Sequence, residues 1–179
     1  MNCEPVISKT HRGEAANHHR QAEAGDFLGL PQTEQSKGVR VGRSRVGRGV
    51  FARKRYRAVA VVGEIHGELI DDATYGSSYC MDMEDGRVLE PHAPFRYVNH
   101  SCDPNCEFEF FDLASDGDPT PRRRIFLITL REIKPGEELT ISYNWGVDAA
   151  IICRCGEPTC CGWIVAPEQL QTIIERERN

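Results

Sequence analysis

The stretch "RYVNHSCDPNC", Arg96 to Cys106, is the most unusual segment of the chain. It packs one histidine, two asparagines, one aspartate and two cysteines into eleven positions. A second dense segment, "CRCGEPTCC", runs from Cys153 to Cys161. Together the two segments hold six of the eight cysteines. The chemistry of these cysteines therefore depends on whether the fold brings the two segments together.

The spacing C-x-C-x4-C in the second segment favours a metal site formed by Cys153, Cys155 and Cys160. Zinc prefers four ligands in a tetrahedron, and a glycine and a proline between the cysteines allow the chain to turn around one ion. Cys161 is a poor fourth ligand, because adjacent side chains rarely reach the same ion. A distant cysteine, Cys102 or Cys106, is the better candidate. The alternative is a group of buried or redox-active thiols. A zinc hydrolase is disfavoured, since four cysteines leave no open position on the ion.

The composition predicts one domain with a real core plus a tail, since the chain has 179 residues of which 40% are apolar. A net charge of -5 argues against a general nucleic-acid binder. Residues 1–30 lack the apolar run of a signal peptide, and no apolar stretch approaches the roughly 20 residues of a membrane span. We therefore expect an intracellular protein with reduced cysteines and no membrane segment. It would be cytoplasmic in a bacterium and nuclear in a eukaryote.

The pattern along the chain predicts a mainly β domain with many short strands. Residues 1–36 are weakly patterned and are expected to form a disordered or weakly structured tail, with His11, His18 and His19 solvated. Expected strands lie within residues 39–51, 58–70, 77–83, 106–113, 123–130 and 139–145. The run "DLASDGDPTPRR", residues 112–123, is expected to be a loop. Residues 167–179 start with a proline and space their apolar residues as in a helix.

Four segments, in this order, resemble the SET-domain protein methyltransferases of the short stand-alone type. They are "VGRGVFA" (46–52), "RYVNHSCDPNC" (96–106), "GEELTISYNW" (136–145) and "CRCGEPTCCGW" (153–163). The resemblance covers roughly residues 38–165. It implies the SET-domain fold of several short curved sheets with a knot-like C-terminal threading, a zinc-stabilised post-SET segment and a C-terminal helix. The implied units are the tail 1–36, the SET domain 37–147, the post-SET segment 148–166 and the helix 167–179.

The resemblance also implies an activity, the transfer of a methyl group from S-adenosylmethionine to a lysine side chain of a protein, with a histone or another basic tail as candidate substrate. Tyr143 matches the catalytic tyrosine, whose phenol oxygen would orient the amine. The implied cofactor-binding positions are Gly47, Arg48, Gly49, Tyr79, Arg96, Asn99, His100 and Trp163. Trp163 is equally suited to a core position. The implied zinc ligands are Cys102, Cys153, Cys155 and Cys160, with Cys106 and Cys161 outside the shell.

Two departures from the family pattern bear on the lysine pocket. Ile65 stands where the family often has a tyrosine, and Ile141 stands where it commonly has phenylalanine or tyrosine. Without a hydroxyl at these positions, we expect a roomier and less polar pocket and more than one methyl group per lysine. The pattern thus leaves the substrate and the product number open.

The charge distribution supports the main alternative, a catalytically weak SET-like zinc module that binds a protein or nucleic acid. Residues 37–57 hold nine Lys or Arg and no acidic residue. A solvated basic face is the simpler explanation, so nucleic acid is not an expected partner. Acidic stretches at 71–72, 82–85 and 107–118 could receive a basic peptide by charge complementarity, or could be ordinary solubilising surface.

Overall fold

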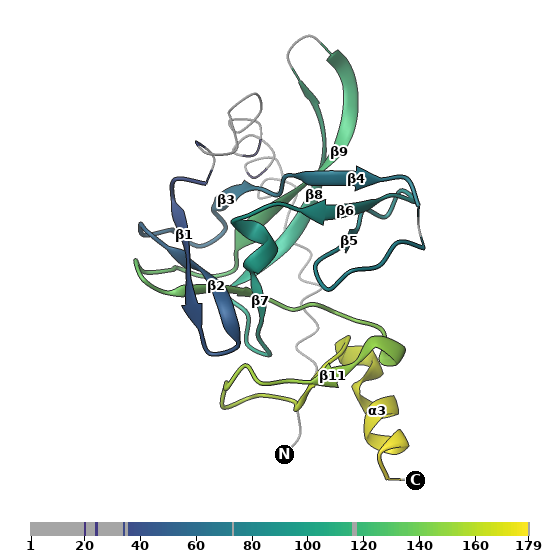
Figure 1. Cartoon of the computed structure of the whole chain (residues 1–179). Helices are drawn as coiled ribbons and strands as arrows, with labels where there is room; N and C mark the ends of the chain where they lie inside the picture. Colours follow the sequence, from purple (N-terminus) through teal and green to yellow (C-terminus); the bar gives the residue numbers. More distant parts are fainter. Residues whose placement is uncertain are drawn as a thin grey trace.

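The computed structural model describes Arg20, Ala24, Glu34 and residues 36–72, 74–115 and 118–178. These residues form small β-sheets and short helical segments, with the C-terminal segment lying below the main body in Figure 1. The expected mainly β fold with several short sheets and a C-terminal helix is confirmed. Most of the expected tail, including His11, His18 and His19, lies outside the described residues.

The sheet that carries the motif segments has the strand order β1-β2-β10-β7. Strands β1 (Val39–Ser44) and β2 (Gly47–Ala52) form a hairpin. Strand β10 (Glu138–Ile141) pairs antiparallel with β2 and parallel with β7 (Asn99–His100). Three segments far apart in the sequence therefore meet in one sheet, with β10 in the middle.

The main core lies beside this sheet, against strands β3 (Val61–Glu64), β9 (Asp118–Thr129) and β8 (Cys106–Ser115). These three strands have the order β3-β9-β8, so the inner end of β9 is paired on both sides. Residues 125–128 of β9 are almost completely buried. This agrees with the continuous apolar run "IFLI" at these positions, since a strand covered on both faces needs no alternation.

The remaining elements flank these two sheets. A third sheet contains β4 (Gly67–Ile70), β6 (Val88–Pro91) and β5 (Met81–Asp82). The C-terminal part contains the ribbon of β11 (Ile151–Ile152) and β12 (Trp163–Ile164). The short helical elements are η1 (Phe95–Tyr97), η2 (Val147–Ala149), η3 (Pro167–Gln169) and α3 (Leu170–Arg176). Among the described residues, none of these helices has the length and apolar composition needed to cross a membrane.

The prediction of a loop over residues 112–123 is wrong. Strand β8 extends to Ser115 and β9 starts at Asp118, and the two strands pair within this run, with Asp112 opposite Arg123 and Leu113 opposite Arg122. Figure 1 shows this hairpin projecting from the top of the body. β3 pairs with β9 only along the inner end of β9, at Phe126, Leu127 and Ile128. In the described chain, the outer half of β9 is thus an edge strand, where a missing N–H is not needed on the open side.

Two expected strands are shorter than predicted. The strand expected over 139–145 ends at Ile141, and Asn144 has a φ of 51° in the left-handed region, which is incompatible with a continuing strand. The strand expected over 77–83 is confined to Met81–Asp82. Because the first of these strands ends early, Tyr143 leaves the sheet instead of facing a neighbouring strand.

Part of the expected tail packs against the body. Ala24 is fully buried in a cluster with Phe111, Phe126 and Ile128, on one face of the β8–β9 sheet. Arg20 is also buried and forms an ion pair with Glu109. For the undescribed part of residues 1–36, a weakly structured tail stays a prediction.

Asn105, the last asparagine of "RYVNHSCDPNC", joins its segment to β10. It is 3% exposed, and its amide nitrogen donates to the carbonyl oxygen of Glu138 at 2.7 Å. Its amide oxygen accepts from the backbone N–H of Thr140 at 2.9 Å. The amide thus satisfies two backbone groups of β10.

We expect Asn105→Ala to lower the free energy of unfolding by about 3 kcal/mol, because two backbone groups would lose their partner at a cost of about 1–3 kcal/mol each. Urea unfolding of the variant and the wild type measures this difference. Gln171→Ala, an exposed change on α3, is the control and should remain within about 0.5 kcal/mol. A loss below about 1 kcal/mol for Asn105→Ala would contradict the structural role.

Candidate functional site

Asn99 is held where three strands of the first sheet meet. Its amide nitrogen lies 2.7 Å from Glu138 Oε1 on β10, 2.8 Å from the carbonyl oxygen of Arg48 on β2 and 3.2 Å from Ser44 Oγ on β1. The predicted cofactor loop, with Gly47, and the predicted cofactor-binding asparagine are therefore in direct contact. Gly47 has a φ of 124° at the start of β2, a conformation that favours glycine.

His100 connects the tyrosine and the cysteines. Its Nδ1 accepts a hydrogen bond from the backbone N–H of Tyr143 at 3.3 Å, which places the ring proton on Nε2. Nε2 lies 3.5 Å from the sulfur of Cys102. Burial lowers the pKa of His100 to about 4, so the imidazole is neutral at physiological pH. His100 is thus a neutral bridge with its N–H directed at a sulfur atom.

Tyr143 presents a neutral phenol with a fixed hydroxyl. The hydroxyl donates to the carbonyl oxygen of Val98 at 2.9 Å, so its proton points into the protein and its lone pairs point away. Burial is the largest cause that raises the pKa of Tyr143 to about 12. The ring also lies 5.1 Å from that of Trp145. The phenol therefore stays protonated at physiological pH and can offer a lone pair, but it cannot act as a base.

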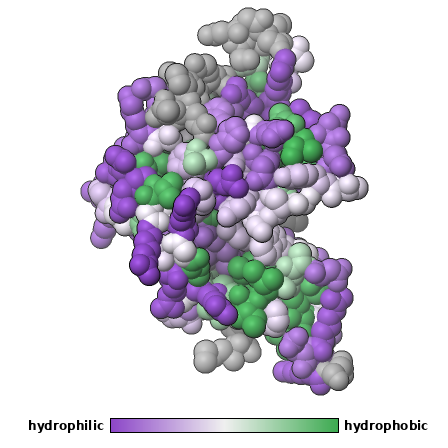
Figure 2. All heavy atoms as spheres, viewed as in Figure 1, coloured by the Kyte–Doolittle hydropathy of each residue, from purple (hydrophilic) through white to green (hydrophobic). Residues whose placement is uncertain are grey.

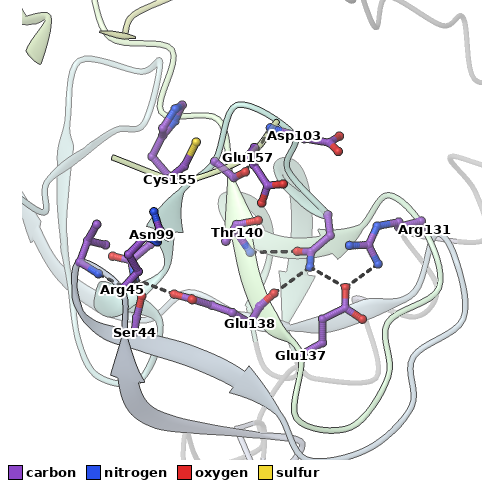
Figure 3. Close-up of a pocket in the computed structure, with 14 residues that line it drawn as sticks. Ser44, Arg45, Asn99, Asp103, Arg131, Glu137, Glu138, Thr140, Cys155 and Glu157 are labelled. Atoms are coloured by element: carbon purple, nitrogen blue, oxygen red, sulfur yellow. Dashed lines mark hydrogen bonds and ion pairs between the residues drawn. The ribbon is translucent and has the colours of Figure 1, made fainter. Parts of the chain in front are cut away.

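A cavity of about 200 Å³ opens beside Asn99 and His100. Figure 3 shows that its wall combines the end of β1, strand β10 and the C-terminal segment, which contribute Ser44, Glu138 and Cys155. Arg45 closes one side: a Cβ built at Gly156 would lie 2.5 Å from the Arg45 guanidinium. The segment that follows the sheet thus forms one wall of the cavity.

Four cysteine thiols from both dense segments form one cluster. They are Cys102, Cys153, Cys155 and Cys160, whose sulfur atoms all lie within 4.8 Å of one another. The Cys102 sulfur lies 3.7 Å from that of Cys153 and 3.8 Å from that of Cys160. Burial raises the pKa of the Cys102 thiol to about 11 in the absence of a cation. Cys106 is fully buried in the apolar core and lies outside this cluster.

Three other predicted residues, Arg48, Tyr79 and Arg96, form a separate stack of arginine and aromatic side chains together with Tyr97. The Arg96 guanidinium lies over the Tyr79 ring at 4.3 Å, and that of Arg48 lies over the Tyr97 ring at 5.1 Å and donates to its hydroxyl. The two rings contact each other edge to face at 6.3 Å. Tyr79 is 43% exposed. The stack joins the β1–β2 hairpin to the loop before β5 and leaves one aromatic face open to solvent.

Trp163 lies apart from these groups, on β12 opposite Ile152. Ile151 and Ile152 on β11 are 50% and 63% exposed. Figure 2 shows apolar side chains gathered over this part of the C-terminal segment. The two departures in the pocket, Ile65 and Ile141, are both buried in the main core, with Tyr143 packed against the same cluster.

Motif reasoning missed four residues that shape this site: Ser44, Asn105, Glu138 and Trp145. Asn105 and Glu138 stand inside the quoted motifs "CDPNC" and "GEEL". A signal for them was available, since polar residues at the edge of an apolar strand require partners. Ser44 carried no comparable signal, because its contact with Asn99 spans 55 positions of the chain.

The acidic stretches are partly neutralised by arginine. Asp85 pairs with Arg87, and Arg123 lies between Glu84 and Asp112. These pairs are mostly exposed and therefore contribute little to stability. They reduce the negative field that a basic peptide would meet at two of the three predicted stretches.

The chain matches the family model of the SET domain over residues 47–144. It is 30% identical over 135 residues to the mouse "Histone-lysine N-methyltransferase, H3 lysine-36 specific", which covers 66% of this chain and 5% of the mouse protein. It is 29% identical over 171 residues to the Arabidopsis thaliana "Histone-lysine N-methyltransferase ATXR7", covering 86% of this chain and 12% of that protein. The chain thus spans a small part of the length of these relatives.

The fold is similar to that of KRYPTONITE, crystallised in complex with mCHG DNA and SAH. The TM-score is 0.60 with 24% sequence identity, over 70% of this chain and 28% of that one. The family model covers more than half of the chain, from the β1–β2 hairpin to the residue after Tyr143. The sheet of motif segments, the tyrosine beside them and the cysteine cluster after them agree with this match. The chain belongs to the SET-domain family.

Proposed function

We propose that the chain transfers a methyl group from S-adenosylmethionine to a lysine side chain of a protein. The observation that carries the proposal is the neutral, anchored phenol of Tyr143 beside His100, a residue that lines the cavity with Asn99. Membership of the SET-domain family supports the reaction class. The names of the relatives, histone-lysine N-methyltransferases, support lysine as the acceptor.

The cavity lining is mostly polar and includes Asn99, His100 and Glu138, which fits the charged amino-acid end of a cofactor. When bound, S-adenosylmethionine supplies a methyl group on a positively charged sulfur. Asn99 and His100 would hold it together with the backbone of residues 47–49. Tyr79, Arg96 and Trp163 stay predictions as cofactor contacts, since none of the three lines the cavity.

Tyr143 would act on the lysine amine. A free lysine has a pKa of about 10.4 and is mostly an unreactive ammonium at neutral pH. A narrow aromatic site, with Trp145 beside Tyr143, would desolvate the amine and favour its neutral form. The Tyr143 hydroxyl already donates to Val98, so it would accept a hydrogen bond from the amine and align it. The contribution of the chain is thus orientation in a dry site.

The cysteine cluster fits a zinc ion. A zinc tetrahedron with bonds of about 2.3 Å has edges of about 3.8 Å between its sulfur atoms. The distances from Cys102 to Cys153 and Cys160, 3.7 and 3.8 Å, match such edges. Zinc would stabilise the thiolates and tie the C-terminal segment to the end of β7. The cavity wall at Cys155 would then depend on the metal.

A histone or another lysine-bearing basic tail is the proposed substrate class, on the strength of the relatives' names. A histone substrate would place the chain in the nucleus of a eukaryotic cell. The acidic stretches do not indicate which lysine is the target. Arginine partly neutralises them, so they present no strongly negative groove for one particular basic peptide.

Two measurements on the purified full chain test the proposal. Calorimetry should detect binding of S-adenosylhomocysteine, and methyl-labelled S-adenosylmethionine should transfer label to core histones or to lysate proteins. Binding without transfer would favour a catalytically weak module. A salt-dependent shift of DNA with no cofactor affinity would favour the nucleic-acid-binding alternative.

Product number is a separate prediction. Ile141 and Ile65 carry no hydroxyl, so we expect the enzyme to form di- or trimethyl-lysine. Time-resolved mass spectrometry of a methylated peptide measures this. Ile141→Tyr should shift the products towards monomethyl-lysine, although the larger ring at a 4% exposed position should also cost about 1–3 kcal/mol of stability. Accumulation of monomethyl product alone in the wild type would contradict the prediction.

A further inference from the structure

Glu138 is a cavity residue to which the motifs assign no role. It lies on β10, an inner strand of the sheet between β2 and β7, where Leu139 and Ile141 point into the core. Because side chains alternate along a strand, the Glu138 carboxylate points away from that core. It reaches both neighbouring strands, towards Gly49 on β2 and Asn99 on β7.

The contact with Asn99 fixes the orientation of its amide. The Glu138 carboxylate and the Arg48 carbonyl, at 2.7 and 2.8 Å, can only accept hydrogen bonds. A flipped amide would place its oxygen against both acceptors. The nitrogen must therefore face them, as Figure 3 shows for the Glu138 contact. Among the described residues, none donates a hydrogen bond to the Asn99 amide oxygen.

The same carboxylate explains the second glycine of "GRG". A Cβ built at Gly49 would overlap with Oε1 of Glu138 and would lie 2.9 Å from Cβ of Ser44. The φ of Gly49 is not in the left-handed range, so its backbone conformation alone does not require glycine. The space above Gly49, which motif reasoning left for the cofactor, is filled by the Glu138 side chain.

We propose that Glu138 is a positioning residue for the cofactor site: it locks the Asn99 amide so that the amide oxygen faces the ligand and accepts a hydrogen bond from a cationic group. This inference rests on the proposed function, where the cationic group is the ammonium of the methionine part of the cofactor. Gly49 is needed because Glu138 occupies its side-chain space. Removing the carboxylate frees the amide to rotate, and one oriented hydrogen bond to a charged group is lost.

Calorimetry of S-adenosylhomocysteine binding to the full chain tests this coupling. Glu138→Ala should weaken binding about tenfold, the usual size of one charge-assisted hydrogen bond. Asn99→Ala should weaken it at least as much, and the double variant should be no weaker than Asn99→Ala alone. Gly49→Ala should also weaken binding, and adding Glu138→Ala to it should cause little further loss. Glu132→Ala, which breaks only an exposed pair with Arg55, is the matched control.

A second readout needs no cofactor. The side-chain amide resonances of Asn99 should be protected from hydrogen exchange in the wild type and in Glu132→Ala, and should lose protection in Glu138→Ala. Unchanged protection would overturn the inference, as would full additivity of the Glu138→Ala and Asn99→Ala effects on affinity. If the wild type binds S-adenosylhomocysteine and Glu138→Ala binds it equally well, this inference alone fails. If the wild type binds none, the proposed function fails and this inference falls with it.

Discussion

Tyr143→Phe is expected to lose most of the methyl transfer, by a factor of about a hundred or more, while its affinity for S-adenosylhomocysteine stays within a few-fold. The phenol hydroxyl donates its proton to the Val98 carbonyl oxygen. Of the two substrates it would contact only the lysine amine and not the cofactor, so its loss removes the orientation of the nucleophile. Loss of a contact that acts in the transition state lowers kcat more than it weakens binding. Single-turnover label transfer and calorimetry measure the two quantities separately.

The control for this substitution is Tyr75→Phe, which removes an exposed hydroxyl 3.5 Å from Glu90. It should retain transfer. Thermal melting should show that Tyr143→Phe lowers the free energy of unfolding by only about 1 kcal/mol, the usual net contribution of one hydrogen bond such as that to Val98. A fully active Tyr143→Phe enzyme would refute the proposed mechanism.

The wild-type rate should rise with pH above 7 as the substrate lysine loses its proton. The phenol stays neutral over this range, because the pKa of Tyr143 is about 12.

Cys160→Ser is expected to reduce the zinc content of the purified chain from about one ion per chain to nearly none, and to abolish methyl transfer. Cys160 is one of four thiols that join the end of β7 to the C-terminal segment. Without the ion, the wall that carries Cys155 and Glu157 would no longer be tied to the cavity at Asn99 and His100. Metal analysis and label transfer provide the measurements.

The matched control is Cys80→Ser, since Cys80 is a free cysteine outside the cluster. It should keep its zinc and its activity. Treatment of the wild type with a strong chelator should reproduce the Cys160→Ser phenotype, and added zinc should reverse the chelator effect but not the substitution. Full metal occupancy in Cys160→Ser would show that the ligand assignment is wrong.

The sequence by itself determined the family and the residues that meet in the site. Its four motif segments contain Asn99, His100, Cys102 and Tyr143, and the order of these segments along the chain was enough to predict the fold class. Local chemistry also predicted that Cys153, Cys155 and Cys160 belong together, because three ligands within eight positions can turn around one centre. Such predictions succeed where the interacting groups are close in sequence or where the motif is long.

Only the tertiary structure decided between distant partners. Spacing alone left Cys102 and Cys106 equal as the fourth member of the cysteine cluster, and only the family resemblance favoured Cys102. The fold separates the two physically, because it buries Cys106 in the core. The hairpin at 112–123 and the early end of β10 depend on which strand edges are paired, which no local pattern encodes. Glu138 could not be assigned from its motif, because its role arises only when β10 lies between β2 and β7. A carboxylate on that middle strand contacts Gly49 and Asn99 together, and contacts across three strands are set by the pairing of the whole sheet.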